Sequence, residues 1–148
     1  YKIHRDFTVD IYGDGTMKEE LRRYIEERQL TEAVHLCGKI DNVPECIRDA
    51  SMFVLSSDYE GLSNALLEAM AVGLPCITTD CAGSEDAIQS RENGLIVPVG
   101  SKKELEVAIT WMIEHPTAAM EMGKKARASM RKYDYENIIT QWENLLSE

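Results

Sequence analysis

Short apolar runs and amphipathic stretches alternate along this chain of 148 residues. The apolar runs predict strands, at residues 8–12, 34–37, 52–56, 76–79 and 95–97, and the run at 52–56 is of the fully buried type. Between the runs, apolar residues recur at spacings of three and four, which predicts helices. Strands that alternate with helices indicate an α/β fold, with a parallel sheet wrapped by helices on both faces.

After residue 101 the pattern is helical. Ser101 and Glu104 have the spacing of a capping box, and Pro116 predicts a break before a second helix at about residues 117–132. Asp134 is predicted to cap a third helix, which carries one apolar stripe. We expect most of that stripe to be ordinary core: Tyr135, Ile138, Ile139, Trp142, Leu145 and Leu146.

The most informative stretch is residues 58–80, which predicts a strand end, a tight turn, a short helix and the next strand. Ser63 is a favourable N-cap and Gly73 a favourable stop. The residues between them leave almost no polar face, which predicts a buried helix. Glu68 is the only charged residue from Gly61 through Thr79, and a carboxylate in such surroundings is costly unless something hydrogen-bonds to it.

A second acid, Glu60, precedes this helix by a few residues. The helix start between Glu60 and Glu68 offers free N–H groups and a positive dipole end, which suit a phosphate. Glu68 lies roughly 7 Å along the helix axis from Ser63, about the span from a diphosphate to a ribose. The alternative is that Glu68 caps a neighbouring loop and Glu60 is a solvated surface acid. For the pair taken together, we favour a bound ligand, with Asn64 as the nearest polar neighbour of Glu68.

The same stretch resembles a known family. Glu60 to Leu62, the run from Leu67 to Ala71, and Gly73 to Pro75 are similar to the signature of two glutamates in retaining, nucleotide-sugar-dependent glycosyltransferases of the GT-B fold (glycosyltransferase family four, group one). The similarity extends from Tyr12 to Pro98. The resemblance implies a hexosyltransferase that uses a nucleotide-sugar, with a UDP-sugar as the commonest donor, in polysaccharide or glycolipid synthesis.

The resemblance also implies roles for individual residues. Glu60 and Glu68 are the implied catalytic pair: Glu68 would bind the ribose hydroxyls, while Glu60, with the backbone of Gly61, Leu62 and Ser63, would hold the donor sugar. The amides near Ser63 and Asn64 would meet the diphosphate. Both carboxylates would be ionised hydrogen-bond acceptors, and no cofactor or metal would be required. The remaining implied donor-binding residues lie in two earlier loops: Gly13, Gly38, Lys39 and Ile40.

Those two earlier loops also have simpler explanations. Gly13 and Gly15 suit an ordinary strand-to-helix turn, followed by a predicted capping box at Thr16 and Glu19. The loop at residues 38–40 suits an ordinary strand-end turn. The family instead implies that the first loop approaches the sugar or phosphate and that the second borders the nucleobase.

The loop at residues 81–86 departs from the family pattern of two glycines, a proline and a glutamate. Only Gly83 remains of the glycine pair, and Asp86 stands where glutamate is common. These departures leave two alternatives for the loop, a role at the donor site or, for Asp86, only a cap on a short helix at residues 87–88.

The start of the chain suggests a piece of a longer protein, because it opens without Met or a helix cap. We expect residues 1–148 to be one nucleotide-sugar-binding domain whose first strand-helix unit is missing. That strand would lie centrally, between residues 8–12 and 52–56. The family's diphosphate-binding Arg and Lys precede this point, and Lys2 and Arg5 do not match their motif. We therefore expect the isolated chain to transfer no sugar, since the acceptor site also belongs to an absent N-terminal domain.

The composition argues against some classes of binding partner. The net charge of −10, from 26 acidic and 16 basic residues, argues against nucleic-acid and general membrane-surface binding. No apolar run approaches the length of a membrane span. Three cysteines, Cys37, Cys46 and Cys76, fall in apolar segments, which predicts buried thiols in a reducing, cytoplasmic compartment. The basic residues at the end of the second C-terminal helix suit a solvated helix end, with peripheral contact to anionic lipid as the weaker alternative: Lys124, Lys125, Arg127, Arg131 and Lys132.

Two rival functions stay open. One is a sugar-nucleotide epimerase or phosphorylase on the same fold, which shares the donor cleft. The other is a non-catalytic α/β nucleotide-binding or regulatory domain of the flavodoxin or response-regulator type. A response regulator needs an acidic cluster with a partner lysine at the strand ends, and the sequence shows no such set.

Overall fold

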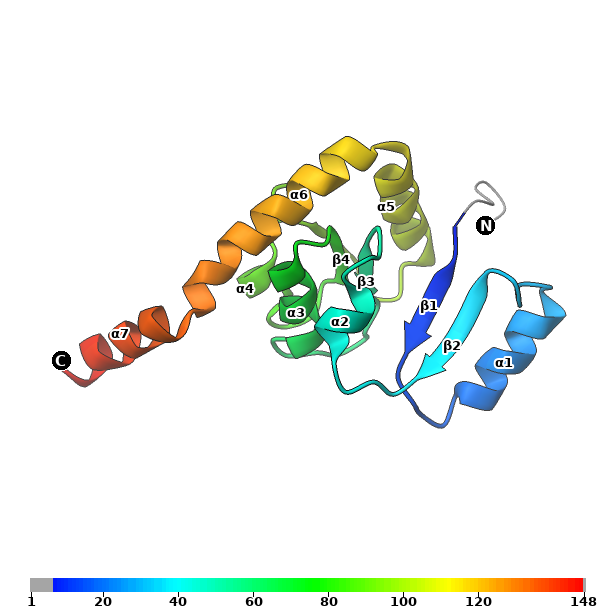
Figure 1. Cartoon of the computed structure of the whole chain (residues 1–148), viewed down its shortest axis with the longest axis horizontal. Coiled ribbons are helices and arrows are strands. Elements are labelled where there is room, and N and C mark those ends of the chain that lie inside the picture. The colour runs from blue at the N-terminus through cyan, green and yellow to red at the C-terminus, as the bar shows by residue number, and fades with distance from the viewer. Residues whose placement is uncertain (1–6, 148) are drawn as a thin grey trace. The chain divides into compact units, whose positions relative to one another are not determined.

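The computed structural model describes residues 7–147, apart from the side chain of Gln141 (Figure 1). The chain groups into two compact units, one ending at Asn42 and the other beginning at Val43. The first contains β1 (Val9–Tyr12), α1 (Lys18–Glu27) and β2 (Val34–Gly38). The second contains α2 (Val43–Ile47), β3 (Phe53–Leu55), α3 (Asn64–Val72), β4 (Cys76–Thr79), α4 (Ser84–Ala87), β5 (Leu95–Val97), α5 (Lys102–Glu114), α6 (Pro116–Ser129), the 3-10 helix η1 (Met130–Tyr133) and α7 (Tyr135–Leu146).

All the strands predicted from the apolar runs form, and they pair in parallel. In the first unit β1 pairs with β2, while in the second the order is β3-β4-β5. Direct pairing of β1 with β3 would have contradicted the expected strand order, and no such pairing exists among the described strands. What would lie between these strands stays a prediction, as does the single domain over residues 1–148.

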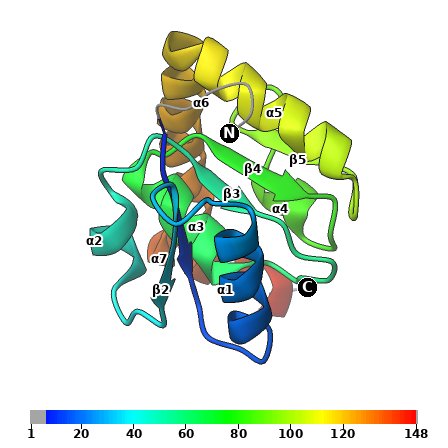
Figure 2. The same cartoon turned by 90° about the vertical axis from the view of Figure 1, so that its right-hand side faces the viewer.

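The centre of the second unit is β4, which is buried along its whole length. Its alternating side chains serve two separate cores. Cys76 belongs to a core with Leu66 and Met70 of α3, whereas Ile77 belongs to one with Met112 of α5. Figure 2 shows α5 on one side of β4 and α3 on the other. The predicted arrangement of helices on both faces of a parallel sheet is therefore confirmed for this unit.

The edge position of β3 corrects one prediction. The run at residues 52–56 has the composition of a fully buried strand, but β3 pairs only with β4 in its sheet and Val54 is 37% exposed. An edge strand lacks one neighbour, and the predicted missing strand would lie on that side of β3, so the apolar composition is that of a strand with two neighbours.

A glycine contact joins α6 to the end of α3. Gly73 ends α3 in the left-handed conformation (φ 88°), as its sequence position predicts. A Cβ added at Gly123 of α6 would overlap the carbonyl oxygen of Gly73 and approach Leu74 and Pro75. Only glycine allows α6 to lie this close, and the contact fixes α3 against the rest of the unit.

Of the two predicted capping boxes, one forms in part and the other does not form. Ser101 caps α5, because its side-chain oxygen accepts a hydrogen bond from the Glu104 N–H (3.4 Å). The Ser101 N–H donates to the Pro98 carbonyl (3.1 Å), so the Glu104 side chain is not needed as its acceptor. The capping box at Thr16 is wrong: α1 begins at Lys18, whose N–H donates to the Gly15 carbonyl (3.2 Å). A backbone turn there replaces the side-chain cap.

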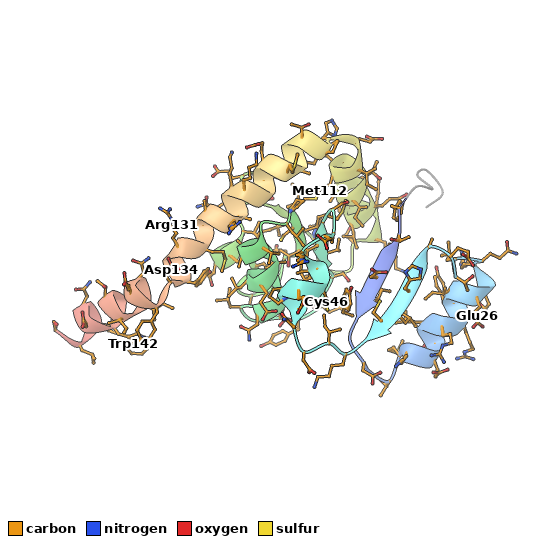
Figure 3. The ribbon with its side chains drawn as sticks, in the orientation of Figure 1. Glu26, Cys46, Met112, Arg131, Asp134 and Trp142 are labelled. Atoms are coloured by element: carbon orange, nitrogen blue, oxygen red, sulfur yellow. The ribbon has the colours of Figure 1, made fainter. Side chains whose placement is uncertain are left out.

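The C-terminal helix corrects another prediction. Asp134 occupies the N-cap position of α7, without a side-chain hydrogen bond to the helix. The apolar stripe of α7, expected to be core, is largely exposed, with Tyr135 at 78% and Trp142 at 60%. Within the second unit α7 extends beyond the end of α6 (Figure 1), and Figure 3 shows Trp142 on it, apart from the sheet. Amphipathic spacing therefore identifies an apolar helix face, but it does not show that another element packs against that face.

The cysteines divide by position. Cys76 is buried in β4, which raises the pKa of its thiol to about 12 because burial disfavours the thiolate. The expected burial of Cys37 and Cys46 is wrong, since both side chains are exposed. Cys37 alternates with Leu36 on β2, and only one face of that strand lies toward α1. Over residues 7–147, none of the helices has the combined length and apolarity that crossing a bilayer requires.

Candidate functional site

The turn between β3 and α3 presents backbone donors. Ser63 has extended backbone angles (φ −74°, ψ 120°), and its side-chain oxygen accepts a hydrogen bond from the Leu66 N–H (3.5 Å). Its carbonyl accepts from the Leu67 N–H (3.0 Å). The N–H groups of Asn64 and Ala65 have no hydrogen-bond partner within residues 7–147. The first turn of α3 therefore offers two free donors at a positive dipole end, which suits an anion.

One face of α3 is accessible, contrary to the predicted burial of the whole helix. Leu66, Ala69 and Met70 are fully buried, but Asn64 is exposed and Glu68 half-buried. A spacing of four residues places Asn64 and Glu68 on the same face, one turn apart. The Glu68 carboxylate has neither a hydrogen-bond partner nor an ion pair in the described part of the chain. The loop-capping alternative for Glu68 therefore has no support among these contacts.

Glu60, in contrast, has a protein partner. The Ser57 hydroxyl donates a hydrogen bond to Oε2 of Glu60 (3.3 Å), and both residues are half-buried. Because this bond engages one carboxylate oxygen, the other stays available to a ligand. The hydrogen bond from Ser57 thus restrains the Glu60 side chain, unlike that of a solvated surface acid.

Several contacts that the sequence did not predict support this turn. The Ser57 carbonyl accepts hydrogen bonds from the Thr79 hydroxyl (2.6 Å) and the Cys81 thiol (3.1 Å). On the other side, a Cβ added at Gly83 would lie 2.9 Å from backbone atoms of Gly61. These contacts join residues more than 20 positions apart, so periodicity and local motifs give no signal for them.

The loop after β4 therefore contributes to the site region despite its departures from the family pattern. Gly83 precedes α4 in the left-handed conformation (φ 84°), and the Ser84 hydroxyl donates to the Thr79 carbonyl (2.7 Å). Asp86 lies inside α4 rather than capping it, so the predicted cap is wrong. Its carbonyl instead accepts hydrogen bonds from the Tyr133 hydroxyl (3.1 Å) and from Lys132.

In the first unit, two of the predicted site loops meet. The Gly13 N–H donates to the Gly38 carbonyl (2.8 Å), at the carboxyl ends of β1 and β2. Both glycines have positive φ (135° and 74°), and neither would bring an added Cβ within 4 Å of another group. Backbone conformation, not crowding, requires glycine at these positions. Lys39 is exposed and Ile40 half-buried in the adjoining loop.

A shallow pocket adjoins the first of these loops. It has a volume of about 270 Å³ and lies between the end of β1 and the start of α1. Its open side leaves backbone atoms accessible, as a close approach to a ligand would require. The lining residues are Ile11, Gly13, Asp14, Gly15, Thr16, Met17, Lys18, Leu21 and Leu36.

The described residues define a parallel α/β protein in which free helix donors lie between two accessible glutamates, an arrangement that suits an anionic ligand. The family model described as "Glycosyl transferases group 1" matches residues 1–129. The chain belongs to this glycosyltransferase family, and the resemblance read from residues 12–98 is confirmed.

Two relatives match nearly all of this chain, which spans under a third of the length of each. It is 30% identical over 139 residues to the poly(ribitol-phosphate) alpha-N-acetylglucosaminyltransferase of Staphylococcus aureus, covering 93% of this chain and 28% of that protein. It is 31% identical over 150 residues to the GtfA subunit of the UDP-N-acetylglucosamine–peptide N-acetylglucosaminyltransferase of Streptococcus gordonii, covering 97% and 29%.

Solved structures agree on the fold. The crystal structure of TarM superimposes with a TM-score of 0.89 at 29% identity, covering 99% of this chain and 30% of that one. Anabaena HepE, solved in complex with UDP, gives a TM-score of 0.86 at 22% identity, covering 95% and 41%, and shows the fold alone. The predicted fold class, that of the C-terminal half of GT-B glycosyltransferases, is confirmed.

Proposed function

We propose that the complete protein is a retaining glycosyltransferase and that this chain holds its nucleotide-sugar donor. One observation carries the proposal. Glu68 is a half-buried carboxylate without a hydrogen-bond or ion-pair partner in the described chain, one turn from the free N–H groups that open α3. The open side of this carboxylate can accept hydrogen bonds from ligand hydroxyl groups without displacing a protein partner.

The proposed contacts follow the length of α3. A diphosphate lies against the N–H groups of Asn64 and Ala65, and the ribose hydroxyls donate to Glu68. The donor sugar lies on the other side of the helix start, against Glu60 and the backbone of Gly61 to Ser63. The axial rise of roughly 6 Å over the four residues from Asn64 to Glu68 is comparable to the separation of those two parts of a nucleotide.

The chemical contribution of these residues is electrostatic. When the bond between the sugar and the diphosphate breaks, negative charge builds on the leaving phosphate. The fixed N–H groups and the dipole of α3 stabilise that charge without reorganising. Both glutamates act as ionised acceptors that orient the donor, and no step requires a metal or a cofactor. The basic residues before β1, Lys2 and Arg5, lie outside the residues that the structure describes.

A UDP-sugar is the proposed donor class. A crystal structure of S. aureus TarM, 29% identical to this chain, was solved in complex with UDP, and the S. gordonii relative carries UDP-N-acetylglucosamine in its name. The S. aureus relative carries poly(ribitol-phosphate), a polymer, in its name, which supports a role in surface polysaccharide or glycolipid synthesis. The acceptor would bind a domain outside residues 1–148, so the isolated chain is expected to be inactive.

Calorimetric titration of the complete protein with UDP, GDP and ADP tests the donor class. We expect UDP to bind most tightly and Glu68→Gln to weaken it about tenfold or more, because the ribose loses a charge-assisted hydrogen bond. Glu106→Gln, on the exposed surface of α5, is the matched control. Unchanged UDP affinity in Glu68→Gln would favour the rival regulatory domain. Epimer formation without an acceptor would favour the epimerase.

A cytoplasmic location with peripheral membrane contact is the remaining part of the proposal. Arg127 and Lys125, exposed on α6, are the cations that anionic lipid would meet. Lys124 is already paired with the Glu121 carboxylate (2.6 Å), which reduces the available charge, whereas Lys132 donates to the neutral Asp86 carbonyl and keeps its charge. Co-sedimentation of the complete protein with phosphatidylglycerol vesicles tests this contact, and loss of binding in Arg127→Gln is the expected result.

A further inference from the structure

We infer that Ser57 is a positioning residue for Glu60 and that the carboxyl end of β4 holds Ser57 in place. The inference rests on the proposed function, because it assigns a purpose to a group that would contact the donor sugar. Its starting point is the hydrogen bond from the Ser57 hydroxyl to Oε2 of Glu60 (3.3 Å). A serine hydroxyl has a single proton, so donating it here fixes one carboxylate oxygen and leaves the other for the ligand.

The backbone of Ser57 is itself immobilised. Its carbonyl accepts from the Thr79 hydroxyl (2.6 Å) and the Cys81 thiol (3.1 Å), which together use both of its lone pairs. Thr79 is 5% exposed and Cys81 9% exposed, so water competes little for these bonds. With the backbone fixed, the remaining freedom of Ser57 is one side-chain torsion, and the bond to Glu60 sets it.

The turn that carries Glu60 is also constrained from the opposite side. Gly83 packs so closely on Gly61 that an added Cβ would lie 2.9 Å from its carbonyl carbon and oxygen. The Thr79 carbonyl accepts from the Ser84 hydroxyl (2.7 Å), which ties the Gly83 loop to the same strand end. Thr79 therefore holds Ser57 through its hydroxyl and the Gly83 loop through its carbonyl.

This arrangement gives Glu60 a defined position before any ligand binds. A glutamate on an exposed turn samples many rotamers, and ordering it on binding costs free energy. Holding one oxygen in advance removes part of that cost and keeps the second oxygen within reach of a donor sugar. Because small displacements of positioning groups lower reaction rates steeply, the Ser57 hydroxyl is expected to affect transfer more than nucleotide binding.

Steady-state transfer by the complete protein, with UDP-N-acetylglucosamine and UDP-glucose as donors, tests the inference. Ser57→Ala should lower kcat about tenfold, which corresponds to about 1.4 kcal/mol of barrier. Its Kd for UDP should stay unchanged, since UDP lacks the sugar that Glu60 holds. Ser57→Thr should restore most of the rate, because it keeps the hydroxyl. Ser56→Ala is the matched control, because Ser56 is exposed and its side chain makes no hydrogen bond within residues 7–147.

A double-variant cycle separates positioning from a general structural effect. In a Glu60→Ala background, Ser57→Ala should cause no further loss, because the group it positions is gone. Thr79→Val, which removes the hydroxyl at constant volume, offers a second route and should lower kcat several-fold in the same manner. A wild-type rate in Ser57→Ala, or an equal loss with and without Glu60, would overturn the inference. If Glu60→Ala itself transfers at the wild-type rate, the proposed role of Glu60 fails and the inference fails with it.

Discussion

The turn from β3 into α3 is held by side-chain hydrogen bonds, whereas the start of α1 after β1 has no side-chain cap and is held by a backbone hydrogen bond and by one ion pair, Lys18 to Asp14 (3.3 Å). In the former, Ser63 caps the helix and Ser57 fixes Glu60. In the latter, α1 starts without a side-chain cap, and Gly13 has open space around its Cα. Side-chain support suits a turn that must present specific acceptors, while an open glycine backbone suits close approach by a ligand.

The same comparison shows two different reasons why a position in a turn requires glycine. At Gly83 both the positive φ and the contact with Gly61 exclude a side chain, whereas at Gly13 only the φ does. The first kind of glycine holds two loops together. The second leaves a surface open, which agrees with the pocket that Gly13 helps to line.

The largest expected effect is the loss of the Gly83 contact. Gly83→Ala adds a Cβ that meets the Gly61 backbone, so we expect it to lower the free energy of unfolding by about 2–4 kcal/mol. Gly100→Ala is the matched control, because Gly100 has a similar positive φ (72°) with nothing within 4 Å of the added Cβ. It should cost only about 1 kcal/mol, the backbone term alone. Urea unfolding of both variants measures the difference. Equal losses of unfolding free energy would show that the contact between Gly83 and Gly61 contributes nothing to stability.

A smaller effect distinguishes the two helix starts. Ser63→Ala removes a side-chain cap and should lower the free energy of unfolding by about 1 kcal/mol. Thr16→Ala at the start of α1 should cost less than about 0.5 kcal/mol, because no cap is lost there. Urea unfolding again provides the measurement. A larger loss for Thr16→Ala than for Ser63→Ala would reverse the comparison.

The smallest effect at neutral pH concerns the thiols. Burial raises the pKa of Cys76 to about 12, so its thiol stays protonated and should resist iodoacetamide while Cys46, which is exposed, reacts. Because the pKa of Cys76 in the folded protein lies above the ordinary thiol value of 9.0, the protonated thiol contributes fully to stability below pH 9.0, and that contribution is lost as pH rises toward 12. Mass spectrometry of peptides after brief labelling checks the reactivity. Rapid labelling of Cys76 in the folded protein would contradict its position in the core.

Local sequence signals predicted the parts of this structure that depend on nearby residues. Apolar runs located the strands, and Ser63 and Gly73 bounded α3 because an N-cap and a left-handed stop act within one helical turn. The capping box at Thr16 failed because Met17, not Thr16, occupies the N-cap position of α1. A capping motif therefore fails when the helix begins at a different residue from the one that the motif marks.

Contacts between distant residues lay beyond sequence reasoning. The bonds from Thr79 and Cys81 to Ser57 join strand ends that become neighbours only once β3 pairs with β4. The same limit explains the accessible face of α3: its composition is apolar nearly all round, but tertiary packing covers only one side of it.

The most direct test of the central claim is a structure of the complete protein with an intact UDP-sugar bound. The account predicts ribose hydroxyl oxygens within about 2.5–3.0 Å of the Glu68 carboxylate. It also predicts the diphosphate against the first turn of α3 and the sugar beside Glu60. A well-ordered donor whose ribose lies out of hydrogen-bonding reach of Glu68 would contradict the account.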